Sequence, residues 1–244
     1  DAQIISDSIY DYDKKTVNIR IKIDEGPQYH FRDIDWIGNT KYNAEVLNQV
    51  LGIKKGDVYD QSLLEENLFV SQQSVSSLYL DDGYLFFSVT PVEVQVENDS
   101  IDLEMRIYEG QQATVSNVVI TGNTRTHEHV IRREIRTKPG QLFNRSDIIR
   151  TTRELAQLGF FNPEKLDVKP EPDPANGTVD LEYVVEEMHS DQIELSGGWG
   201  ANTIVGTLGL SFNNFSIRNV LKKGAWRRIP SGDGQKLSIS SQTN

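Results

Sequence analysis

Residues 31–40 read FRDIDWIGNT, and residues 115–124 read VSNVVITGNT, with the same closing Gly-Asn-Thr. The offset of 84 between them also relates Glu25-Gly26 to Glu109-Gly110. Eight extra residues stand before Gly83 in the first copy, and the last strand then matches at an offset of 78. Self-similarity at a fixed period is the sequence signature of repeated structural units. The sequence therefore predicts two copies of one module, each of about 80 residues, which is enough to hold a core.

Each copy reads as a β-α-α-β-β unit of the α+β class. A short strand ends in the Gly-Asn-Thr turn, where glycine tolerates positive φ. Two helices follow; the second is predicted to begin at a capping box, Ser62 with Glu65, in the first copy and at Asn144 in the second. The closing strands alternate apolar and polar residues, which indicates a three-stranded sheet with one buried face. In the first copy we expect that face to carry Val92, Val94 and Val96.

A third, partial copy precedes the two complete ones. The run VNIRIKI at residues 17–23 matches the strand at Ile101 with the same offset of 84. We therefore interpret residues 1–26 as the C-terminal strands of an upstream module, in whose tail the sequence begins.

The pattern changes after residue 188. Glycine and serine become frequent, and three runs place apolar residues at every second position, with aromatic residues near the ends. Such strands of about ten residues are typical of membrane β-barrels. The large apolar members are Ile193, Leu195, Trp199, Ile204, Leu208, Leu210, Phe212, Leu237 and Ile239. A soluble β-hairpin is the alternative that the pattern leaves open.

Charge varies along the chain. Residues 1–110 contain 9 Lys and Arg against 21 Asp and Glu, whereas residues 189–244 contain 6 against 3. The formal net charge of the whole chain is −11, which repels phosphate backbones and argues against a nucleic-acid partner. The chain contains no cysteine, which excludes disulfides and cysteine metal sites.

Motifs for enzymatic chemistry are absent from the sequence. His127-Glu128-His129 suggests a metal pair, but this spacing on a helix would point the two imidazoles to different sides, and no third ligand is evident. We also find no phosphate-binding glycine loop and no nucleophile elbow. The sequence therefore predicts a protein without a catalytic site, a metal or a cofactor.

As an ordered set, these features resemble the BamA family of outer-membrane β-barrel assembly proteins. The matching motifs are the Glu-Gly entry, the Gly-Asn-Thr turn, Lys138-Pro139-Gly140 between the helices, and the tail runs GGWG (197–200) and LGLSFNNF (208–215). The resemblance implies tandem POTRA modules followed by a truncated antiparallel β-barrel. The implied domains are residues 1–26 from an upstream POTRA module, 27–110 and 111–188 as two POTRA modules, and 189–244 as the first barrel strands.

The same resemblance implies a function. The chain would be the periplasmic arm of the assembly machinery in the bacterial outer membrane, with its POTRA modules in the periplasm. It would bind unfolded outer-membrane proteins and accessory lipoprotein subunits and pass clients to the barrel for folding and insertion. Two alternatives stay open: the POTRA region of a two-partner secretion transporter, and a purely structural docking scaffold.

The expected mode of binding is β-augmentation, in which a client strand pairs with an open sheet edge. The family topology leaves the second strand of each module at an edge. In the second module this strand, residues 166–174, contains prolines that cannot donate to a ladder, so we predict a blunted edge there. The predicted open edge consists of Val89, Val92, Glu93, Val94, Gln95, Val96 and Glu97. Alternatively, Glu93 and Glu97 are protective edge charges and nothing binds.

A second candidate surface is basic. The second module, which would lie nearest the membrane, is predicted to turn arginines toward anionic headgroups or an accessory subunit. These residues are Arg132, Arg133, Arg136, Arg150 and Arg153. Solvated helix faces are the alternative interpretation.

Overall fold

The computed structural model describes residues 3–13, 16–200, 203–223, 226 and 229–243. The chain divides into two compact units. The first comprises Asp1–Ser76 and Ser88–Tyr108, and the second comprises Ser77–Phe87 and Glu109–Asn244. No helix among the described residues is long and apolar enough to cross a membrane.

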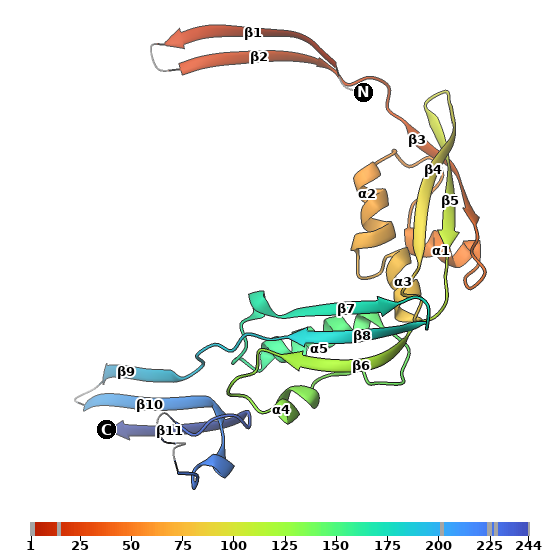
Figure 1. Ribbon diagram of the computed structural model, residues 1–244. Helices are drawn as coiled ribbons and strands as arrows, with labels where there is room; N and C mark the ends of the chain where they lie inside the picture. Colours follow the sequence, from red (N-terminus) through yellow and green to blue (C-terminus); the bar gives the residue numbers. More distant parts are fainter. Residues whose placement is uncertain (1–2, 14–15, 201–202, 224–225, 227–228, 244) are drawn as a thin grey trace. The chain divides into compact units, whose positions relative to one another are not determined.

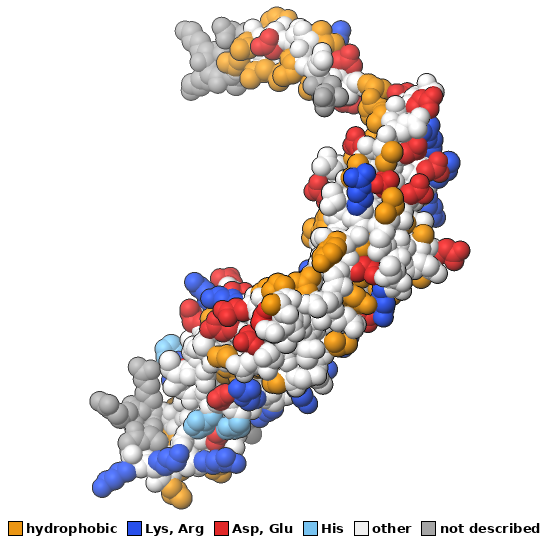
Figure 2. All heavy atoms as spheres, turned by 45° about the vertical axis from the view of Figure 1, so that its right-hand side comes forward, with side chains coloured by type: hydrophobic (Ala, Val, Ile, Leu, Met, Phe, Trp, Pro, Cys, Tyr) orange, Lys and Arg blue, Asp and Glu red, His pale blue; other side chains and the backbone are white. Residues whose placement is uncertain are grey.

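The first unit begins with a hairpin of two antiparallel strands, β1 (Gln3–Asp13) and β2 (Thr16–Asp24) (Figure 1). Its apolar side chains are largely exposed, for example Ile4 at 68% and Ile19 at 65%. Figure 2 shows such apolar side chains along its surface. Two paired strands with an uncovered apolar face do not form a core of their own.

The first unit also contains a three-stranded sheet in the order β3-β5-β4. The strands are β3 (His30–Ile37), β4 (Ser88–Glu97) and β5 (Ser100–Tyr108); β3 runs parallel to β5, and β4 antiparallel. Between β3 and β4 the chain forms α1 (Ala44–Leu51), α2 (Gln61–Glu65), the π-helix η1 (Glu66–Val70) and α3 (Val75–Asp81). The order is the predicted one, with the second helix broken into three pieces where the eight extra residues fall.

Two local predictions for the first module are wrong. The N-cap of α2 is Asp60, whose carboxylate accepts hydrogen bonds from the backbone N–H groups of Ser62 and Leu63, so the helix begins before the expected capping box. The expected buried face of β4 also fails, because Val94 and Val96 are 60% and 52% exposed. Val92 lies opposite Glu104, whereas Val89 lies opposite the buried Ile107, so Val92 is on the outer face of the sheet. A register shift between Glu93 and Gln95 then leaves Val94 without an opposite residue, and Val96, although opposite the buried Ile101, stays exposed near the end of the strand.

The second unit repeats the arrangement with the order β6-β8-β7. Its strands are β6 (Thr114–Thr121), β7 (Asp167–Asp173) and β8 (Thr178–Val184), and its helices are α4 (Glu128–Arg132), α5 (Arg145–Gln157) and the 3-10 turn η2 (Pro163–Lys165). Asn144 caps α5 as predicted, accepting from the N–H of Asp147 at 2.8 Å. The core includes Val118, Ile131, Leu155, Phe161, Leu181 and Tyr183, with Leu80, Leu85 and Phe86 packed against it.

The Gly-Asn-Thr turns explain why the repeat retains glycine. Gly38 and Gly122 have φ of +89° and +91°. A Cβ atom at Gly38 would overlap the carbonyl oxygen of Ile107, and one at Gly122 would overlap that of Val185. Both the backbone conformation and the close approach of a second chain segment therefore require glycine.

The tail of the second unit is an antiparallel sheet in the order β11-β10-β9. Its strands are β9 (Gln192–Gly200), β10 (Thr203–Phe215) and β11 (Gln235–Thr243), with the 3-10 turn η3 (Ile217–Asn219) after β10. Leu208 lies opposite Leu195, and Leu210 opposite both Ile193 and Ile239, so one face is apolar. That face is open: Leu195 is 83% and Trp199 86% exposed.

Candidate functional site

Strand β4 lies at the edge of its sheet and pairs only with β5 among the described residues. In an antiparallel pair, alternate residues direct their backbone groups toward the partner strand and away from it. The ladder is continuous through Pro91, which cannot donate to it, so Pro91 occupies an outward position. Val89 and Glu93 are each two positions from Pro91, so their N–H groups also point outward. Beyond the bulge, the N–H of Val96 points outward as well. Its opposite residue, Ile101, is two positions from Leu103 on β5, just as Leu103, the partner of Glu93, is two positions from the partner of Pro91.

Side chains on this edge are mostly exposed and partly engaged. Glu93 accepts a hydrogen bond from the hydroxyl of Tyr59 at 3.1 Å. Glu97 receives one from Arg32 at 3.4 Å. The carboxylates are thus tied to the module itself, while no backbone group on the outer side of β4 has a partner among the described residues.

Strand β7 occupies the same place in the second sheet, but its edge differs. The β7–β8 ladder runs from Asp167 to Asp173 without a register shift, although it contains Pro170 and Pro172. Both prolines therefore stand at positions whose N–H would face outward. The outer edge of β7 lacks these two donors in succession, and Pro174 follows at the next position of the same parity.

The opposite edges, β3 and β6, are covered in part. His30 forms an antiparallel bridge with Val58, and Thr114 forms the equivalent bridge with Leu142. The N–H of Phe31 also donates to the carbonyl of Asp57 at 2.9 Å. Of the four outer strands in the two modules, β4 is therefore the one with the most open run of backbone donors and acceptors in the described part of the chain.

Three of the five predicted basic residues are paired within the second unit. Arg132 forms an ion pair with Glu128, Arg133 with Glu134, and Arg136 with Glu154. Hydrogen bonding to Glu154 raises the pKa of Arg136, and the same bond lowers the pKa of Glu154.

Arg150 and Arg153 are the other two members of that set. Both are exposed, and neither has an ion-pair partner within the described ranges. Within the predicted patch, the positive charges without an ion pair therefore lie on α5, although Arg150 is close enough to Glu154 to help lower the pKa of that carboxyl.

Glu187 fixes the junction between the second module and the tail. Its side chain is 5% exposed and accepts hydrogen bonds from the Thr124 hydroxyl at 2.7 Å and the Thr126 N–H at 2.5 Å. The Arg125 N–H lies 2.9 Å and 3.0 Å from its two oxygens. Burial alone would raise the pKa of Glu187, but these hydrogen bonds outweigh it, so the pKa is lowered. A carboxylate two residues after Val185 therefore holds the Gly-Asn-Thr turn of the second module.

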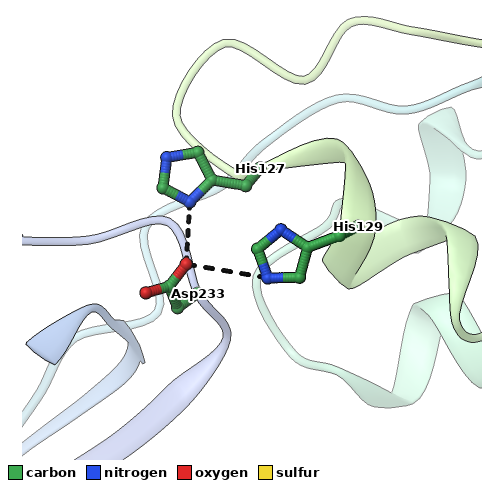
Figure 3. A group of neighbouring side chains, drawn as sticks. All are labelled: His127, His129 and Asp233. Atoms are coloured by element: carbon green, nitrogen blue, oxygen red, sulfur yellow. Dashed lines mark hydrogen bonds and ion pairs between the residues drawn. The ribbon is translucent and has the colours of Figure 1, made fainter. Parts of the chain in front are cut away.

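His127 and His129 do not point to different sides of a helix, and that expectation is wrong. His127 is the N-cap of α4 with extended φ and ψ, so helical spacing does not apply to it. The two rings lie stacked with centroids 5.7 Å apart and face the carboxylate of Asp233, as Figure 3 shows. The Nδ1 of His127 is 2.8 Å and the Nε2 of His129 is 3.7 Å from Asp233 Oδ1.

Sequence reasoning could not pair these residues, because Asp233 stands 106 positions after His127. The one available signal was His127 itself. Ser, Thr, Asp or Asn usually occupies the N-cap position, and His127 makes no capping hydrogen bond with its side chain.

Comparison with known proteins matches both modules to one protein family. The sequence profile of POTRA, described as "Surface antigen variable number repeat", matches residues 29–110 and 113–188. An outer membrane protein assembly factor BamA from Neisseria meningitidis serogroup B is 28% identical over 209 residues, covering 83% of this chain and 25% of the relative. The chain thus spans about a quarter of that relative's length.

Two solved structures share the fold. The POTRA3-5 fragment of Haemophilus influenzae BamA is 26% identical with a TM-score of 0.59, covering 76% of this chain and 72% of the fragment. BamA from Haemophilus ducreyi lacking POTRA domains 1-3 has a TM-score of 0.68 at 21% identity, covering 88% of this chain and 37% of that one. The second likeness extends the match of the fold beyond the modules.

Proposed function

We propose that this chain, which belongs to the POTRA family, is the periplasmic arm and first membrane strands of an outer-membrane protein assembly factor, and that β4 receives client strands. The family resemblance predicted from the sequence is confirmed by the POTRA profile and the BamA relatives. Capture of unfolded outer-membrane proteins and their transfer to the barrel are the parts of the proposal that go beyond this membership.

The observation that carries the proposal is the outer edge of β4. Unfolded outer-membrane proteins share strand-forming segments of alternating hydrophobicity and differ in sequence. A site that binds them must therefore read backbone rather than side chains, as β-augmentation does. The outward N–H groups of Val89, Glu93 and Val96 supply such a site, and the exposed side chains of Val94 and Val96 add apolar surface.

The test uses the absence of cysteine, which makes any introduced thiol unique. We would place cysteine at Val94 on β4 or at Glu171 on β7, both exposed, and add a barrel-strand peptide whose single cysteine is activated as a mixed disulfide, so that the introduced thiolate displaces the activating thiol. Strand pairing predicts rapid disulfide formation with Val94→Cys and little with Glu171→Cys. Equal labelling of both positions would contradict the proposed asymmetry.

Matched proline variants distinguish strand pairing at the edge from nonspecific binding of the peptide. Val96→Pro removes one outward donor from β4 without removing a ladder bond, and should reduce labelling at Val94→Cys. Pro170→Val combined with Pro172→Val restores two outward donors to β7, and should raise labelling at Glu171→Cys. Labelling that ignores both changes would show that the peptide does not pair as a strand.

The basic residues are the second part of the proposal. Arg150 and Arg153 are exposed on α5 without an ion pair among the described residues, and each exposed Lys or Arg near an anionic surface contributes about 1 kcal/mol to binding. Replacing both with Glu should weaken binding of the chain to phosphatidylserine vesicles by at least ~30-fold, with binding to neutral vesicles unchanged. The same loss for an Arg133→Glu control, or no loss for the double variant, would refute the assignment to α5.

A purely structural docking role makes a different prediction. The accessory subunits would then bind the chain while strand peptides would not label Val94→Cys. The peptide experiment therefore also distinguishes the proposed function from this alternative.

A further inference from the structure

We infer that His127, His129 and Asp233 form a binding site for a divalent transition metal such as Zn²⁺, which clasps the start of α4 to the loop before β11. His127 and His129 come from the second module, and Asp233 comes from the segment between β10 and β11 (Figure 3). The inference is independent of strand capture at β4.

The spacing of the three ligand atoms suits a small tetrahedral ion. Bonds of about 2.0–2.1 Å in a tetrahedral zinc site place neighbouring ligand atoms roughly 3.3 Å apart. The ligand atoms here lie within 4.8 Å of one another, with His127 and His129 nitrogens 2.8 Å and 3.7 Å from Asp233 Oδ1. Because the imidazoles are 44% and 57% exposed, small rotations suffice to reach ideal distances, and water can complete the coordination.

The carboxylate is held in place by its surroundings. Asp233 is 7% exposed, and its Oδ2 accepts a hydrogen bond at 2.6 Å from the hydroxyl of Ser216, which is fully buried. This leaves Oδ1 to face the imidazoles. Metal-binding carboxylates are commonly fixed in this way by a hydrogen bond to the oxygen that does not face the ion.

The backbone around the carboxylate is also tied to its neighbours. The N–H of His127 donates to the carbonyl of Gly232 at 2.8 Å, and the N–H of Gly232 donates to the carbonyl of Asn214 at 2.9 Å. Gly234 N–H donates to the side-chain oxygen of Asn214 at 2.8 Å. The ligands are therefore brought together by the fold before any ion binds.

The ligand set selects the class of metal. Two imidazole nitrogens and one carboxylate suit Zn²⁺, Cu²⁺, Ni²⁺ or Fe²⁺, whereas Mg²⁺ and Ca²⁺ require oxygen ligands. The positive charge of the exposed Arg218 lies near Asp233 and would repel a metal cation bound there. We therefore expect Arg218→Gln to strengthen zinc binding.

The experiment is a zinc titration of the purified chain against a chromophoric chelator. We expect one saturable site per chain and no competition from Mg²⁺ or Ca²⁺. His129→Gln should weaken zinc binding at least ~100-fold, and Ser216→Ala by ~10- to 100-fold. His189→Gln is the control, because His189 is also exposed and lies outside the proposed ligand set, and should leave the affinity unchanged.

A second readout separates a clasp from incidental binding. Opening of the loop exposes the amides of His127 and Gly232, and zinc at 100 times its dissociation constant should slow their hydrogen exchange by about 100-fold. The absence of a saturable site, equal weakening by His189→Gln and His129→Gln, or bound zinc without slower exchange would each overturn the inference. The last outcome would mean that zinc binds without joining α4 to the loop before β11.

Discussion

Replacing Glu187 with Gln tests how the junction after β8 is held. The carboxylate accepts hydrogen bonds from the Thr124 hydroxyl and from the backbone N–H groups of Arg125 and Thr126. Gln keeps the size of the side chain but offers one oxygen instead of two, and turns an NH₂ group toward a donor. Thr126 is 2% exposed, so water cannot replace the lost acceptor at its N–H.

The magnitude follows from these contacts. A hydrogen bond to a charged group contributes about 1.5–3 kcal/mol, and a buried donor left without a partner costs about 1–3 kcal/mol. Thr124 and Arg125 are exposed and contribute less, because water can bind them. We therefore expect Glu187→Gln to lower the free energy of opening by about 2–3 kcal/mol at pH 7, which corresponds to roughly 30- to 150-fold faster exchange.

Hydrogen exchange measured by mass spectrometry on peptides covering residues 121–132 is the appropriate assay, because a chain of two units does not unfold in one step. Glu186→Gln is the matched control: Glu186 is adjacent and exposed, so exchange should not change. Equal effects of the two substitutions, or no effect of Glu187→Gln, would refute the role assigned to Glu187.

The pH dependence has a definite sign. The folded-state pKa of Glu187 is lowered from its usual value of 4.5, so its stabilisation is complete above that value and is lost as pH falls through the folded-state pKa. The difference between the native chain and Glu187→Gln should therefore be constant from pH 7 down to about pH 5 and should shrink only as the pH falls below 4.5, through the lowered folded-state pKa.

Two further substitutions test packing in the second module by the same exchange assay. Gly122→Ala should destabilise the module by ~2 kcal/mol more than Gly140→Ala. Both substitutions strain a residue with positive φ, but only a Cβ atom at Gly122 overlaps a carbonyl oxygen. An equal loss of stability for the two variants would contradict this. Tyr183→Phe should cost about 1–2 kcal/mol, because it leaves the buried Thr137 hydroxyl, 2.8 Å away, without its partner; Thr137→Val added to it should recover part of the loss, and a further loss would argue against the pair.

The repeat made the fold predictable from the sequence. Two copies in register identify the turn glycines Gly38 and Gly122 by their positions, and the conformational need of such turns predicts positive φ. The helix start at Asn144 followed from local capping chemistry, which depends on residues three apart. Features set by neighbours along the chain were therefore accessible.

Features set by distant neighbours were not accessible. Asp81 illustrates this: as part of an acidic pair it resembles a solvated surface, yet its carboxylate accepts hydrogen bonds from the N–H and hydroxyl of Ser146 at the start of α5. The bulge at Val94 depends on how β4 pairs with β5, and alternation alone cannot reveal it. The approach of Asp233 to the two histidines likewise depends on the packing of the tail against the second module.

The candidate edges fall between these cases. The prolines of β7 are visible in the sequence, and their chemistry predicts a blunted edge without coordinates. The open N–H donors of β4 could be identified only from its register with β5. The position of each residue relative to Pro91 in that ladder decides whether its N–H faces β5 or solvent.

Amide exchange at individual residues of β4 and β7, with and without a barrel-strand peptide, tests strand capture most directly. Strand capture at β4 predicts that the peptide protects the amides of Glu93 and Val96, whose N–H groups face outward, and leaves Val168 on β7 unchanged. Protection spread evenly over both strands, or none on β4, would contradict it.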